Sequence, residues 1–80
     1  MGVVEQGEEF IRDLGFKQVR VRYHGNTARI EVMGDDIKKL AGNEDVRKKI
    51  LKKFKKLGFA YITVDLEGYR TGSMNEPVKS

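Results

Sequence analysis

The stretch from Val19 to Val32, VRVRYHGNTARIEV, alternates apolar and polar residues on both sides of a short turn sequence. Its first half alternates two valines and a tyrosine with two arginines, and its second half alternates alanine, isoleucine and valine with an arginine and a glutamate. Successive side chains of a strand point to opposite faces. The pattern therefore predicts a β-hairpin with one apolar face and one face that carries three arginines and a glutamate.

The Gly25-Asn26 pair predicts the register of this hairpin. A two-residue loop there is of the primed type that right-twisted strands prefer. It pairs three sets of residues across the strands: Tyr23 with Ala28, Arg22 with Arg29, and Arg20 with Glu31. We therefore expect an ion pair between Arg20 and Glu31. The like charges of Arg22 and Arg29 cost stability unless an anion or an acidic neighbour lies between them.

Two amphipathic segments predict helices on either side of the hairpin. From about residue 4 to residue 14 the apolar side chains share one helical face, and Gly15 is placed to end the helix. A second, longer helix follows Asn43, a favourable N-cap, and ends at Gly58. Its apolar stripe consists of Val46, Ile50, Phe54 and Leu57, and its polar face carries Arg47, Lys48, Lys49, Lys52, Lys53, Lys55 and Lys56. Between hairpin and second helix, Asp35-Asp36 is expected to cap a short helical turn.

A third strand is predicted at 59–66, where apolar and polar residues alternate again. We expect a two-layer α+β domain, α-β-β-α-β, whose three-stranded antiparallel sheet has the order 2-1-3 and is covered on one face by two helices, as in half of a ferredoxin-like fold. Residues 1–66 form the domain and residues 67–80 a loop and a frayed tail. The uncovered side of the sheet, called the open face below, collects Gln18, Arg20, Arg22, Arg29, Glu31, Tyr61, Thr63 and Asp65.

Composition narrows the class of protein. Eighty residues form one small domain with a thin stability margin. The absence of cysteine excludes a disulfide framework, a thiolate metal site and a thiol nucleophile, and favours the cytoplasm. Apolar runs of a few residues are too short to span a bilayer. The net charge of +4 is compatible with an anionic partner.

The arginines of the open face, with Glu31, are the best candidates for chemistry, because guanidinium forks bind phosphate or carboxylate in a bidentate manner. The alternative is a solvated face with a salt bridge. Alternatively, the lysine-rich helix and the basic sheet face form a nucleic-acid-binding module, or the lysines are only the solvated side of an amphipathic helix. A further alternative is a protein-interaction module whose open sheet face docks onto a neighbouring domain. A lone His24 at a turn and the Asp35-Asp36 pair are ordinary structural residues. The sequence contains no P-loop or zinc spacing, so we expect no complete active site in this chain.

Two segments together carry a family resemblance. GFKQVRVRYHGNTARIEV, preceded by an acidic helix, and LGFAYITVDLEGYRTGSMNE resemble the C-terminal region of a PP-loop ATP pyrophosphatase family. The best-known members are ATP-dependent sacrificial sulfur transferases, which supply sulfur for the nickel-pincer cofactor of lactate racemase. The resemblance covers residues 5–76.

The resemblance implies roles for particular residues. Arg20 and Arg22 of VRVR are expected to contact a phosphate group, as is Arg70 of EGYR. Glu31 of ARIEV and Glu8 of the first helix are expected to belong to an acidic, metal-binding set. ATP and a divalent metal are the cofactors implied for the full family protein, and none is expected to be bound by this chain alone.

The chain also departs from the family pattern. It lacks the nucleotide loop and the donor cysteine, so ATP hydrolysis and sulfur donation do not carry over to it. The expected partner is a PP-loop domain, either in the same polypeptide or as a separate protein. A phosphate-containing ligand and a second copy of the chain are the other expected partners.

Overall fold

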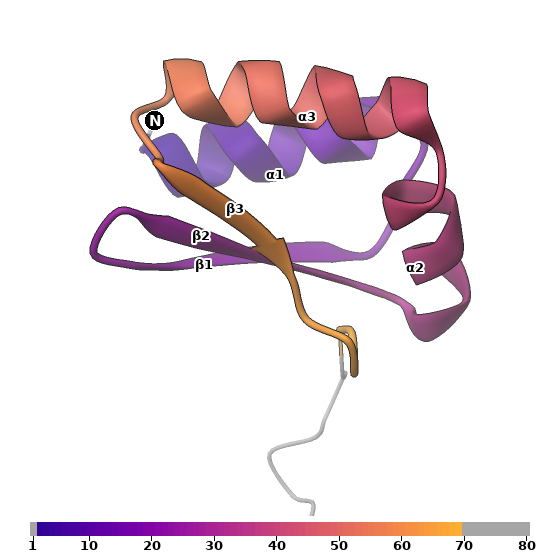
Figure 1. Cartoon of the computed structure of the whole chain (residues 1–80). Coiled ribbons are helices and arrows are strands. Elements are labelled where there is room, and N and C mark those ends of the chain that lie inside the picture. The colour runs from indigo at the N-terminus through magenta and orange to yellow at the C-terminus, as the bar shows by residue number, and fades with distance from the viewer. Residues whose placement is uncertain (1, 70–80) are drawn as a thin grey trace, which may run out of the picture.

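A computed structural model of the chain describes residues 2–69. The order of elements is α1 (Val3–Asp13), β1 (Val19–His24), β2 (Thr27–Val32), α2 (Gly34–Ala41), α3 (Glu44–Lys56) and β3 (Tyr61–Val64). In Figure 1, α1 and α3 lie side by side over one face of the sheet, and α2 lies near the end of β2. The predicted α+β class and single helical layer are confirmed. None of these helices has the length and apolarity needed to cross a bilayer.

The predicted sheet arrangement is wrong in two respects. The strand order is β1-β2-β3, with β2 in the centre, and β3 runs parallel to β2, so the sheet is mixed and is not the antiparallel 2-1-3 sheet of half a ferredoxin-like fold. The chain entering β3 explains the placement, because the N–H groups of Ala60 and Tyr61 both donate to the carbonyl oxygen of Asn26, the turn residue just before β2. This anchors β3 beside β2 rather than beside β1.

The helix count also differs from the prediction. The expected short turn after the hairpin is an eight-residue helix, α2, so the order is α-β-β-α-α-β. Asp35 and Asp36 do not cap it: the N-cap is Met33, and the two aspartates lie in the first turn, where their negative charge suits the helix dipole. Both aspartates therefore have a structural role at the start of α2.

The hairpin agrees with its predicted register. Tyr23 faces Ala28, Arg22 faces Arg29, and Arg20 faces Glu31. Gly25 has a φ of 60° and no other turn residue has a positive φ, which is the pattern of a type II′ turn. The sequence predicts a primed turn at Gly25, and the structure has one. The residues of the turn therefore determine the register of the hairpin.

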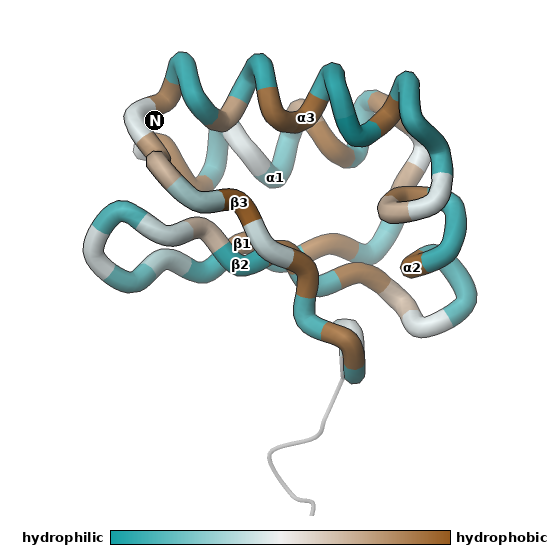
Figure 2. The backbone as a smooth tube through the Cα atoms, in the orientation of Figure 1, coloured by the Kyte–Doolittle hydropathy of each residue, from teal (hydrophilic) through white to brown (hydrophobic). Residues whose placement is uncertain are grey.

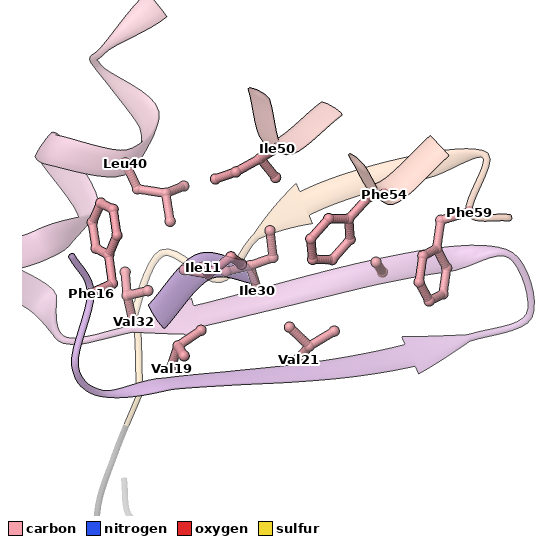
Figure 3. Close-up of a cluster of buried hydrophobic side chains, with 11 residues drawn as sticks. Ile11, Phe16, Val19, Val21, Ile30, Val32, Leu40, Ile50, Phe54 and Phe59 are labelled. Atoms are coloured by element: carbon pink, nitrogen blue, oxygen red, sulfur yellow. The ribbon is translucent and has the colours of Figure 1, made fainter. Parts of the chain in front are cut away.

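The core lies between the sheet and the three helices. Figure 3 shows side chains of β1 and β2 facing Ile11 of α1, Leu40 of α2, and Ile50 and Phe54 of α3. Phe54 and Ile11 are both fully buried. Gly7 of α1 packs closely on Phe54 of α3: a Cβ atom, if Gly7 had one, would lie 2.7 Å from Cζ of Phe54. The absence of a side chain at Gly7 is what allows this approach.

The N-terminus of α3 is capped as predicted. The Asn43 side-chain oxygen accepts a hydrogen bond from the Val46 N–H at 3.1 Å. We expect Asn43→Ala to lower the free energy of unfolding by about 1 kcal/mol, because it leaves this donor without its cap. Urea denaturation followed by circular dichroism measures the loss. Asn43→Ser retains a capping oxygen and is the control; an equal loss in both variants would contradict the capping role.

Candidate anion-binding site

The open face is centred on one buried carboxylate. Glu31 lies on β2 between residues of the core, and its side chain is 6% exposed. Its Oε2 atom lies 3.1 Å from Nε of Arg22 and 3.3 Å from a terminal guanidinium nitrogen of Arg29. The two arginines are half exposed. Glu31 is thus the acidic neighbour that the sequence required between two like charges.

The predicted ion pair between Arg20 and Glu31 is not formed. Although the two residues face each other across the strands, Glu31 contacts Arg22, its diagonal neighbour, and Arg29 on its own strand. Side chains at diagonal positions are within reach of long residues such as arginine. The Arg20 guanidinium instead lies over the Tyr69 ring, 5.5 Å from the ring centroid, in a cation–π contact.

The turn that carries Tyr69 is attached to the end of β2. The Tyr69 N–H donates to the Val32 carbonyl oxygen at 2.7 Å, and the Gly68 N–H donates to the Asp65 carbonyl oxygen. Asp65 also lies 3.8 Å from the Arg29 Nε atom. Residues after the predicted domain boundary at 66 therefore contribute to the site. The boundary itself stays a prediction.

A hollow of about 460 Å³ opens beside the two arginines. It lies toward the hairpin turn, and its lining consists of Arg22, Tyr23, His24, Thr27, Arg29 and Thr63. The Thr63 hydroxyl donates to the Ala28 carbonyl oxygen at 3.0 Å, which leaves its oxygen as an acceptor. Guanidinium groups at the side of a polar hollow form a surface that suits a phosphate or carboxylate group.

Sequence reasoning missed part of this lining. From the sequence, His24 is interpreted as an ordinary turn residue and Thr27 is not a candidate. The two-residue turn pairs these residues with each other and places both on the face of Arg22 and Arg29. The register is therefore a sufficient signal for them. The sequence does predict Thr63 on the open face, but its position beside Arg29 requires the correct neighbour for β3.

Glu8 lies apart from this group. It belongs to α1, its Oε2 accepts a hydrogen bond from the Val21 N–H at 2.9 Å, and its Oε1 lies 3.9 Å from Arg12. It thus satisfies a backbone donor on the outer edge of β1. Within residues 2–69 no cluster of three histidine, aspartate or glutamate side chains could hold a metal ion. Arg70 lies outside the described residues.

The fold and the candidate site define a small α+β region whose open face carries half-exposed guanidinium groups around a buried carboxylate. No protein-family model matches the chain. It is 42% identical over 77 residues to the pyridinium-3,5-bisthiocarboxylic acid mononucleotide synthase of Lactiplantibacillus plantarum. It is also 39% identical over 72 residues to an uncharacterized protein of Synechocystis and 38% identical over 68 residues to an uncharacterized protein of Methanocaldococcus jannaschii.

These matches cover most of the chain but little of the relatives. They include 85% to 91% of this chain and 25% or 26% of each relative, so the chain spans about a quarter of their length. The chain is homologous to the C-terminal quarter of the synthase. The predicted resemblance to the C-terminal region of the sulfur-transferase family is therefore confirmed. The share covered is also consistent with a position next to another domain.

Proposed function

We propose that this chain forms one wall of a phosphate-binding site in a protein of the sulfur-transferase type, beside a PP-loop domain that supplies the nucleotide chemistry. The single observation that carries the proposal is the arrangement of Arg22, Glu31 and Arg29. A carboxylate that orients two guanidinium groups prepares them to bind an anion with little loss of side-chain freedom. Homology to a quarter of a mononucleotide synthase supports the same assignment.

The charges around Glu31 favour an incoming anion. The open face carries three arginines, Arg20, Arg22 and Arg29. It carries two carboxylates, Glu31 and Asp65, and so retains one net positive charge. Each guanidinium has five N–H donors, and the ion pairs with Glu31 use few of them. The remaining donors of Arg22 and Arg29 are available to phosphate oxygens. Arg20, held over Tyr69, lies at the other end of the face.

The predicted metal role fits the described residues poorly. Glu31 offers one carboxylate, whose Oε2 atom is already shared by two arginines, and Glu8 is engaged at the edge of β1. A divalent cation normally requires several oxygen ligands around one point. We therefore assign Glu31 to the orientation of the arginines and derive no step through a metal ion. The chain also contains no cysteine, so sulfur donation belongs to other parts of the proposed assembly.

Inorganic phosphate tests this proposal directly. We expect amide and side-chain NMR signals of Arg22, Arg29 and Thr63 to shift in a saturable manner at millimolar phosphate. Arg22→Ala should weaken binding about fivefold or more, since it removes one charge-assisted donor. Arg12→Ala removes an arginine that pairs with Glu8 instead, and should leave binding unchanged.

Two results would contradict the assignment. Unchanged spectra at high phosphate, with a PP-loop protein of the same type absent or present, would exclude a phosphate site on this face. Equal weakening by Arg22→Ala and Arg12→Ala would show a response to net charge alone. Chloride at the same ionic strength is the salt control, because screening acts on all exposed charges.

A further inference from the structure

A second surface lies in the helical layer, on the side of the sheet opposite to the open face. Between α1 and α3 runs a groove of about 300 Å³. Phe10 and Leu14, both half buried, form its apolar floor. The rim consists of Lys49, Lys52, Lys53 and Lys56. We call this surface the basic groove.

The four lysines form one stripe along α3. Their spacing of three, one and three residues places them on a single helical face that turns toward α1. Figure 2 shows hydrophilic stretches alternating with hydrophobic ones along α3, as expected for a helix with one buried side. Like charges at such spacings lower helix stability. The lysine stripe therefore lowers the stability of α3 within this chain.

The ion pairs among residues 2–69 leave the charge of this stripe unneutralised. The carboxylates that form these pairs do so with Arg12, Arg22, Arg29, Lys39 and Lys48. None of them pairs with a lysine of the basic groove. The Lys53 ammonium lies 5.9 Å from the centroid of the Phe10 ring, in a cation–π contact that leaves its charge in place. The basic groove thus combines positive charge with an apolar floor.

We propose that the basic groove binds an acidic amphipathic helix of a partner protein. Apolar side chains on one face of such a helix would contact Phe10 and Leu14, and carboxylates beside them would meet the lysine stripe. A linear row of charges along one helix matches a second helix lying in the groove, which is a common mode of peptide recognition. The charge complementarity, rather than any measured partner, identifies the occupant.

A nucleic acid fits the basic groove less well. Single-stranded nucleic acid binds through several aromatic side chains on which bases stack. The groove contains one aromatic ring, Phe10, and Lys53 already lies over it. An RNA oligonucleotide is therefore the competing ligand in the test. Because the basic groove and the open face lie on opposite sides of the sheet, this proposal and the phosphate site succeed or fail independently.

The test uses the full chain and synthetic peptides in a fluorescence anisotropy titration. The probe is a labelled peptide of about 15 residues, long enough to form a helix, with leucines on one face and glutamates beside them. We expect Lys52→Glu and Lys49→Glu each to weaken binding about fivefold, since each reverses a charge of the stripe. Lys38→Glu, an equal charge change on α2, should change affinity less than about twofold. Circular dichroism confirms that the variants are folded.

Three outcomes would overturn the proposal. A scrambled peptide of the same composition that binds equally well would show attraction to charge without a groove. Tighter binding of an oligouridine probe, reduced by Lys52→Glu, would assign the groove to nucleic acid. Absence of peptide binding at low salt, where electrostatic attraction is strongest, would exclude an acidic helix as the occupant.

Discussion

Replacing Gly7 with valine is expected to lower the free energy of unfolding by about 3 kcal/mol. Gly7 lies within α1 and is buried against α3. Even the first side-chain carbon would lie 2.7 Å from Cζ and 3.1 Å from Cε2 of Phe54. The Phe54 ring cannot move away, because it is fully buried. Valine adds two further methyl groups at this point, so the two helices must separate.

Helix propensity acts in the opposite direction and is smaller. Glycine inside a helix costs about 1 kcal/mol relative to alanine, and part of this is recovered by any substitution. The steric cost of overpacking a core is typically about 1–3 kcal/mol, and occasionally more. We therefore expect Gly7→Ala to lower stability as well, by less than Gly7→Val does.

Chemical denaturation with urea measures both variants. Gly34→Ala is the matched control, because Gly34 is also helical and a side-chain carbon there meets nothing within 4 Å. Its stability should stay within about 0.5 kcal/mol of the parent protein. Equal stability of Gly7→Ala and Gly34→Ala would contradict the close packing of α1 on α3 at Gly7.

Local sequence signals predict the elements better than their arrangement. The helices, the glycines that end them and the hairpin register follow from residues close together in the chain, such as Gly25 and Asn43. Which hairpin strand lies next to β3 does not follow from local sequence, because both strands alternate apolar and polar residues and both offer an apolar face. The sequence contains one signal that β1 is an edge strand. The strand carries two arginines and a histidine toward one side, and charged residues are common on edge strands. Strand β2 is more buried, as a central strand should be.

The candidate site is predictable in composition but not in its contacts. The pattern of alternation places Arg20, Arg22, Arg29 and Glu31 on one face, which the register confirms. Which arginine meets Glu31 depends on sheet twist and on the position of Tyr69, which follows β3. Neither is encoded in the hairpin itself. The contact of Arg20 with Tyr69 therefore could not be anticipated from the hairpin residues.

Replacing Glu31 with glutamine is expected to lower the free energy of unfolding by about 2 kcal/mol, the scale of hydrogen bonds to charged groups. The change preserves the shape of the buried side chain and removes its charge. Arg22 and Arg29, which face each other in the register, then repel without an anion between them. Thermal denaturation should show the loss at low salt, and added salt should reduce it.

Phosphate should act on this variant in the opposite direction. Glutamine keeps a side-chain oxygen that can orient the two guanidinium groups, but it no longer competes with an external anion for them. If Arg22 and Arg29 bind anions, Glu31→Gln should therefore bind phosphate more tightly than the parent protein. A ligand that binds the folded state alone raises stability according to its concentration and affinity. Phosphate should therefore restore more stability to Glu31→Gln than it adds to the parent, and chloride at equal ionic strength should not. The same gain in both proteins would show that Glu31 does not compete with phosphate for Arg22 and Arg29, and would limit Glu31 to a structural ion pair. A larger gain in the variant would show that Glu31 occupies the place of an anion and tunes how strongly this face binds one.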